Sequence, residues 1–169
     1  MERKVPDWTF CDPINFELDE DRKTMEPGIE NFAGVIIQNE KGEVLLVRKV
    51  EQYAYAIPWC RVTPGKTLRK CLVDRVMDLT GLSIQPVFLG PNEHIEESNH
   101  FISFDHTARI DSGEHHYIRE GLDHLWTGVD ELLTVPLVAL TRQILERYFL
   151  DHGIEPGLSS EPKGSISGN

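Results

Sequence analysis

The segment from residue 60 to residue 82 constrains the fold more than any other part of this chain of 169 residues, because both ends of a helix are marked in it. Pro64 and Gly65 precede the helix and Gly81 follows it, which is the usual punctuation of helix ends. At about 3.6 residues per turn, one side of this helix is apolar. That side consists of Leu68, Leu72, Val76 and Leu79. The sequence therefore predicts an amphipathic helix over residues 67–79, with an outward face that carries Cys71, Asp74, Arg75 and Asp78.

Apolar runs on both sides of this helix predict β-strands. The runs 32–37 and 44–47 are separated by a turn-rich stretch from Asn39 to Gly42, which is typical of a hairpin. Further strands are predicted at 84–89, 101–110 and 122–127. A polar loop is expected at 90–99, and Pro136 is expected to open a final amphipathic helix.

Polar and apolar side chains alternate in the predicted strand at 101–110. Side chains two residues apart lie on the same face of a strand. One face therefore carries Ser103, Asp105, Thr107 and Arg109. The opposite face carries His100, Ile102, Phe104, His106 and Ala108. The polar face could line a pocket.

Length and composition predict one soluble domain with an extension at each end. Hydrophobic residues make up 40% of the chain, and no apolar run approaches the roughly 20 residues of a membrane span, so no membrane partner is expected. We expect residues 1–28 to form an acidic N-terminal arm and residues 29–152 to form the domain. Residues 153–169 are rich in Gly, Ser and Pro and are expected to be a disordered tail.

The charge balance argues against a nucleic-acid partner. The chain has 17 basic and 28 acidic residues, a net charge of -11, whereas binding to a phosphate backbone needs concentrated Lys and Arg. Three cysteines form no C-x-x-C pair, and no secretory signal opens the sequence, so a reducing cytoplasm is the expected location.

The segment around the predicted helix, CRVTPGKTLRKCLVDRVMDLTGL, resembles the Nudix box, G-x5-E-x7-R-E-U-x-E-E-x-G-U, in which U is aliphatic. Aligned on the final glycine, Val76, Gly81 and Leu82 match the box. Cys60 replaces its first glycine and Lys66 its first glutamate. The pair Asp74-Arg75 stands for Arg-Glu, and the pair Asp78-Leu79 for the last two glutamates.

The flanking sequence extends the resemblance to about residues 29–150. The stretch FAGVIIQNEKGEVLLVRK is similar to the hairpin that opens Nudix domains, and LDHLWTGVDELL to a strand and short helix that follow the box. In YAIPWCRVTPG, Trp59 and Cys60 replace the two glycines of the family pattern W-x-L-P-G-G-x-V-x-P-G. The resemblance implies an α/β protein of the α+β type with the Nudix fold, a mixed β-sheet sandwiched between helices.

In the Nudix family the box glutamates hold a divalent metal against a substrate diphosphate, and water attacks phosphorus. The matching residues here are Lys66, Arg75, Asp78 and Leu79, whose formal charges give +1 where four glutamates would give -4. One unit of charge at about 4 Å is worth about 4 kcal/mol at an effective dielectric constant of about 20, before screening. The usual metal site should therefore be absent, and no cofactor is expected.

An arginine in place of the metal could hold a phosphate directly. We therefore predict a protein that binds a nucleoside-diphosphate-like small molecule without standard hydrolysis. The candidate ligand-binding residues are Arg48, Trp59, Arg61, Lys66, Arg75 and Arg109. Arg75 could instead pair with Asp74 or Asp78 on a solvated helix face, Arg48 could simply keep a strand end soluble, and Trp59 could fill the vacated metal space.

Two other functions remain open. A divergent hydrolase would bind Mg²⁺ or Mn²⁺ at a rebuilt site with Asp74 and Asp78, and Glu97 or Glu120 would be its general base. A non-catalytic protein-interaction module would keep only the scaffold, and a homodimer is compatible with the sequence.

Six histidines fall in one third of the chain, either as loop and surface residues or as a metal cluster. They are His94, His100, His106, His115, His116 and His124.

Overall fold

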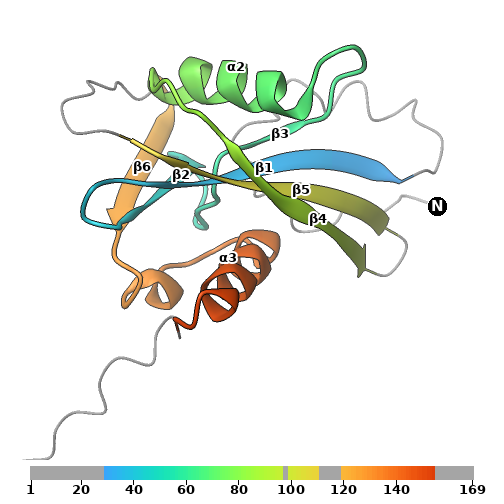
Figure 1. The fold of residues 1–169 in the computed structure, drawn as a ribbon. Coiled ribbons are helices and arrows are strands. Elements are labelled where there is room, and N and C mark those ends of the chain that lie inside the picture. Colours follow the sequence, from blue (N-terminus) through green and yellow to red (C-terminus); the bar gives the residue numbers. More distant parts are fainter. Residues whose placement is uncertain (1–28, 97–98, 111–118, 155–169) are drawn as a thin grey trace, which may run out of the picture.

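The computed structural model describes residues 29–96, 99–110 and 119–154, so the predicted N-terminal arm and most of the predicted tail lie outside the described residues. Figure 1 shows the arrangement of the elements. In chain order they are β1 (Glu30–Gln38), β2 (Val44–Lys49), β3 (Trp59–Arg61), α2 (Leu68–Thr80), β4 (Val87–Glu96), β5 (Asn99–Arg109), β6 (Leu122–Thr127), the 3-10 helix η3 (Leu132–Thr134) and α3 (Ala139–Asp151).

The strands form one mixed sheet between two helices. The strand order is β4-β5-β1-β2-β6, and β3 pairs with β1 off this path. β1 and β5 are parallel, whereas the other neighbouring pairs are antiparallel. α2 covers one face of the sheet and α3 covers the other (Figure 1). This layering is the predicted sandwich of a mixed sheet between helices.

The predicted helix at 67–79 is confirmed as α2, because both of its ends are fixed by local signals. The Thr67 side chain accepts a hydrogen bond from the backbone N–H of Lys70, and Gly81 ends the helix in the left-handed conformation at φ 68°. The prediction that Cys71 faces outward is wrong, since its side chain is buried. At about 100° per residue, Cys71 lies only about 60° from Leu68, and the buried arc is wider than the apolar stripe.

The bounds of β4 and α3 differ from the predictions because long-range pairing decides them. The strand predicted from residue 84 starts only at Val87, where its pairing with β5 begins. Residues 90–96, predicted as loop, extend β4, which pairs with β5 as far as Glu96 and Asn99. α3 begins at Ala139 and not at Pro136. The Pro136 carbonyl accepts from the backbone N–H of Tyr55, and the Val138 N–H donates to the Tyr55 carbonyl, so this stretch bridges to a distant loop before the helix starts.

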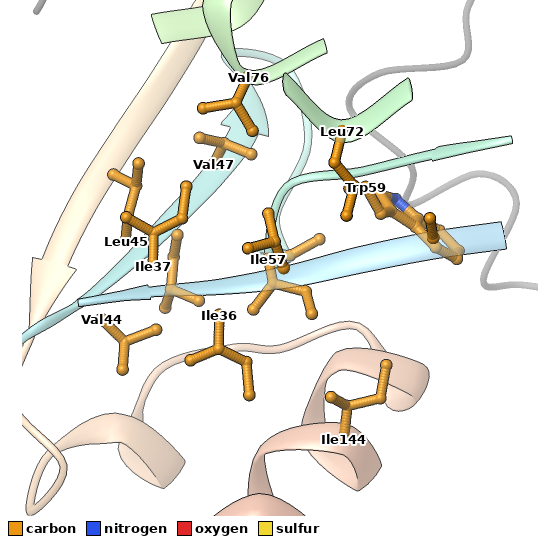
Figure 2. Close-up of a cluster of buried hydrophobic side chains, with 14 of the residues drawn as sticks. Ile36, Ile37, Val44, Leu45, Val47, Ile57, Trp59, Leu72, Val76 and Ile144 are labelled. Atoms are coloured by element: carbon orange, nitrogen blue, oxygen red, sulfur yellow. The ribbon is translucent and has the colours of Figure 1, made fainter. Parts of the chain in front are cut away.

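The hydrophobic core occupies both faces of β1 and β2. Figure 2 shows Ile36 and Val44 pointing toward Ile144 of α3, while Val47 lies toward Val76 of α2. All five of these side chains are buried. Neither described helix is long and apolar enough to span a membrane.

Candidate functional site

The solvent-facing side of α2 carries a carboxylate held by two lysines. Lys70 Nζ lies 2.8 Å from Asp74 Oδ1, and Lys66 Nζ lies 3.6 Å from Asp74 Oδ2. The hydrogen bond from Lys70, with the charges of both lysines, holds the pKa of Asp74 below its usual value. Lys70 is not among the predicted site residues, although its position four residues before Asp74 is the signal for such a pair. The negative charge of Asp74 is therefore already compensated by cations of the chain itself.

The second carboxylate of α2 is also paired with a cation. Arg119 Nη1 donates to Asp78 Oδ2 over 3.1 Å, and both side chains are at least half exposed. This contact joins α2 to the residue 41 positions later that precedes β6. Magnesium is usually bound through one or two carboxylates together with water. Both carboxylates of α2 are engaged by cations of the chain, so a magnesium ion would compete with Lys66, Lys70 and Arg119 for them.

The other acidic candidates do not complete a metal site in the described part of the chain. Glu120 is exposed in the turn before β6, and Glu97 lies outside the described residues. Within residues 29–96, 99–110 and 119–154, no three His, Cys, Asp or Glu side chains are grouped so that they could hold a metal ion.

Arg75 lies at the edge of the buried side of α2. Its side chain is half-buried. A helix turns by about 100° per residue, so Arg75 lies within about 20° of Leu68 around the helix axis. The ion pairs of Asp74 and Asp78 are made with Lys66, Lys70 and Arg119. Helical geometry alone could have shown that Arg75 sits closer to the core than Asp74 does.

Arg48 belongs to a network that ties β2 to β6. Its Nε and Nη2 donate to Asp123 Oδ2 over 3.1 and 3.0 Å, and its guanidinium lies 4.3 Å from the centre of the Tyr55 ring. The Tyr55 hydroxyl donates to the same oxygen over 2.9 Å. This hydrogen bond from Tyr55, together with those from Arg48, lowers the pKa of Asp123. The position of Arg48 thus fits a structural role.

Trp59 and Arg61 flank the same buried ring. Trp59 is 4% exposed and packs on Phe32 with 4.8 Å between ring centres, so its indole could stack on a ligand only after leaving the core (Figure 2). Arg61 lies 5.8 Å above Phe32 and pairs with Glu30 at 3.5 Å. Arg109 is exposed at the far end of β5. The structure therefore brings Lys66, just before α2, to Asp74 of that helix, and places Arg48 and Arg109 elsewhere.

A separate cavity of about 290 Å³ lies on the opposite side of the sheet, between β4, β5 and the C-terminal half of α3. Its lining includes Asn92 and Asp105 from the strands and Arg147, Tyr148 and His152 from the helix and its end. The side-chain amide of Asn92 donates to Asp105, and Arg147 donates to Asn92. The predicted polar face of β5 therefore lines a cavity through Asp105.

Asp105 is a buried carboxyl group. It is only 4% exposed, and its Oδ1 has no hydrogen-bond partner in the described structure. Burial raises the pKa of Asp105 above its usual value, against the opposing effects of Asn92, Ser103 and the nearby histidines. The group therefore keeps its proton to a higher pH than an exposed aspartate does.

The described histidines are dispersed and do not converge on a metal. His94 stacks on Phe101 at 5.0 Å, and its Nε2 lies 3.0 Å from the Ser103 hydroxyl. His100 pairs with Glu93 at 2.6 Å. His106 is buried, its Nδ1 lies 2.9 Å from the Phe104 carbonyl, and burial lowers its pKa. His115 and His116 lie outside the described residues.

Comparison with known proteins identifies the fold. No protein-family profile and no curated protein sequence matches the chain. Solved structures do match. The MutT protein from Methanosarcina mazei Go1 has a TM-score of 0.62 at 18% identity, over 77% of this chain and 99% of that chain. A NUDIX hydrolase from Nitrosomonas europaea has a TM-score of 0.60 at 18% identity, over 76% of this chain and 93% of that chain.

A third match has a bound nucleotide derivative. The NUDIX domain of Shewanella oneidensis NrtR, solved with ADP ribose, has a TM-score of 0.62 at 13% identity, over 79% of this chain and 97% of that chain. These low identities establish a shared architecture and not a shared activity. The chain thus has the Nudix fold, and the predicted fold class is confirmed.

Proposed function

We propose that this Nudix-fold protein binds an anionic, nucleoside-diphosphate-like ligand at the exposed face of α2 and lacks the metal-dependent pyrophosphohydrolase reaction. The observation that supports this most is that both carboxylates on that face are already neutralised by cations. Asp74 is held by Lys66 and Lys70, and Asp78 is held by Arg119. A divalent ion would have to displace these cations before it met a free carboxylate.

The same face has a surplus of positive charge in a chain that is otherwise strongly acidic. Lys66, Lys70 and Arg119 are exposed, and the two carboxylates of Asp74 and Asp78 oppose these three cations. The whole chain has a net charge of -11, so this surplus is local. Ammonium and guanidinium groups bind phosphate oxygens through charge-assisted hydrogen bonds. A diphosphate is therefore a suitable ligand for this face.

The structural relatives suggest the rest of the ligand. One of them, the NrtR NUDIX domain, was solved with ADP ribose, in which a diphosphate joins two ribose units. A diphosphate group on a nucleoside would match the cations of α2 in the same way. We therefore choose ADP ribose and nucleoside diphosphates as the compounds to test.

Calorimetric titration and thermal shift, with magnesium and with a chelator, test the proposal. We expect stabilisation by ADP ribose to survive chelation. Lys70→Glu should weaken binding by tenfold or more, because a charge-assisted hydrogen bond contributes about 1.5–3 kcal/mol and tenfold in affinity is about 1.4 kcal/mol.

The matched control is Lys41→Glu, which makes the same charge change at an exposed lysine in the turn between β1 and β2. It should leave the affinity unchanged. Binding that requires magnesium, or metal-dependent release of a nucleoside monophosphate that is lost in Glu120→Gln, would favour a divergent hydrolase and defeat the proposal.

A further inference from the structure

The cavity between β4, β5 and the C-terminal half of α3 lies beside a β-bulge. The pairing of β4 with β5 shifts register between Phe88 and Gly90, so Leu89 is an extra residue on β4. Leu89 and Gly90 follow each other in the chain, yet both line the cavity. Consecutive residues of a regular strand point to opposite faces. The bulge therefore turns this part of β4 toward α3, and bulges are frequent next to active sites.

The cavity combines apolar surface with a buried carboxyl group. Leu89 and Pro91 of β4 and Ile144 of α3 supply the apolar surface. Asp105 is buried, and burial raises its pKa, so this group adds less negative charge than an exposed aspartate would. The volume of about 290 Å³ is close to the lower end of the roughly 300–1,000 Å³ of ligand pockets, which favours a small metabolite.

Two opposite charges on α3 line the same cavity without pairing with each other. Arg147 and Asp151 are exposed and four residues apart, and both line the cavity. Arg142 and Glu146 have the same spacing on the same helix and form an ion pair at 3.9 Å. Arg147 donates instead to Asn92 of β4. Among the described residues, neither Arg147 nor Asp151 forms an ion pair, so a ligand can meet both charges.

Asn92 holds the guanidinium of Arg147 in place without neutralising it. The Asn92 amide donates to Asp105, and its oxygen accepts from Arg147, so the guanidinium is tied to the wall of the cavity. An asparagine side chain has no charge to offset that of the arginine. A guanidinium has five N–H donors, so several remain for a ligand after the bond to Asn92. A carboxylate is the group that fits these donors best.

We propose that this cavity binds a free α-amino acid with an apolar side chain. The ligand carboxylate accepts hydrogen bonds from Arg147, and its ammonium group donates to Asp151. Residues four apart on a helix have Cβ atoms about 5–6 Å apart, and an amino acid carries both charged groups on one carbon, so it can bridge them. The side chain of the ligand lies against Leu89 and Ile144. This site is separate from the face of α2 and goes beyond the function proposed for that face.

An NMR titration that follows the backbone amides of the full chain tests the proposal with L-leucine. Isocaproate, which lacks the ammonium group, and isoamylamine, which lacks the carboxylate, are the matched probes. We expect saturable shifts at Leu89, Ile144 and Tyr148 with L-leucine. Each matched probe should bind at least fivefold more weakly, because one of the two charged contacts is lost.

Substitutions on α3 separate the two contacts. Arg147→Gln and Asp151→Asn should each weaken binding of L-leucine at least fivefold. The matched controls are Arg142→Gln and Glu146→Gln, which remove the same charges at the same spacing on the same helix but outside the cavity lining. Both controls should bind L-leucine as the wild type does. Leu89→Trp, at a residue that is 44% exposed, should fill the cavity and abolish binding.

Three results would overturn the proposal. The first is the absence of saturable shifts with both L-leucine and L-phenylalanine. The second is binding of isocaproate as tight as that of L-leucine, because the site would then be a simple anion site. The third is loss of L-leucine binding in Lys70→Glu, which would place the ligand on α2. Unchanged L-leucine binding in Lys70→Glu is the expected result, so the two proposed sites stand or fall separately.

Discussion

Replacing Asp105 by asparagine should flatten the pH dependence of stability in the mildly acidic range. Asp105 is 4% exposed, and burial raises its pKa, so the folded protein keeps this proton where the unfolded chain, with an ordinary pKa of 3.8, loses it. The native state then binds more protons than the unfolded state, and the free energy of unfolding falls as the pH rises. The loss begins near pH 3.8 and stops once the pH passes the folded pKa.

One proton sets the upper limit of this effect. The free energy of unfolding can fall by about 1.4 kcal/mol per pH unit. Between pH 4 and pH 6 the total fall can therefore reach about 3 kcal/mol. That is a large share of the roughly 5–15 kcal/mol by which domains are stable. An asparagine side chain cannot ionise, so the contribution should vanish in Asp105→Asn. The absolute stability of the variant can differ for other reasons, such as a new amide donor near Gly34, and only the slope is diagnostic.

Urea unfolding of wild type and variant at several pH values from 4 to 6 measures the slope. Burial lowers the pKa of His106 from its usual 6.5 toward this range, so the comparison is repeated in a His106→Gln background. The carboxylates with lowered pKa values, Asp74 and Asp123, contribute equally to both proteins and cancel in the difference. Asp130→Asn, at an exposed position after β6, is the control and should keep the wild-type slope. The same slope in Asp105→Asn as in wild type would refute the reasoning.

Two further predictions concern the contacts that hold the domain together. Asp123→Ala should lower the free energy of unfolding by about 1 kcal/mol, because it leaves the part-buried Tyr55 hydroxyl and Arg48 without their shared acceptor. In urea unfolding, Tyr55→Phe with Asp123→Ala should cost less than the sum of the two, and strict additivity would show that the contact contributes nothing. Gly81→Ala should cost about 1–2 kcal/mol, since Gly81 ends α2 at φ 68°. Gly128→Ala, where an added Cβ meets no atom within 4 Å and φ is not left-handed, should be nearly neutral, and equal thermal shifts in the two variants would contradict this explanation.

The parts of the fold that follow from local physics could be predicted from the sequence. The bounds of α2 follow from Thr67 and Gly81, which satisfy backbone groups within one turn of themselves. The strand predicted at 122–127 coincides with β6, because the glycine before it and the Leu, Trp and Thr residues within it are local signals of a strand. The resemblance to the Nudix family likewise depends on residues that are close together in the chain. The solved structures confirm the fold that it implied, while the altered box stays a prediction.

Tertiary structure decided what each candidate side chain contacts. Arg48 meets Asp123, which is 75 residues away, and Arg119 meets Asp78 across 41 residues. These pairs depend on strand register and on the return of the chain from β5 to β6, and no local signal encodes them. Pairing with β5 likewise turned the polar stretch 90–96 into strand. The sequence determined which charges the chain carries, while the packing of distant segments determined which of them neutralise one another, because ion pairs form only between groups that the fold brings within a few ångströms.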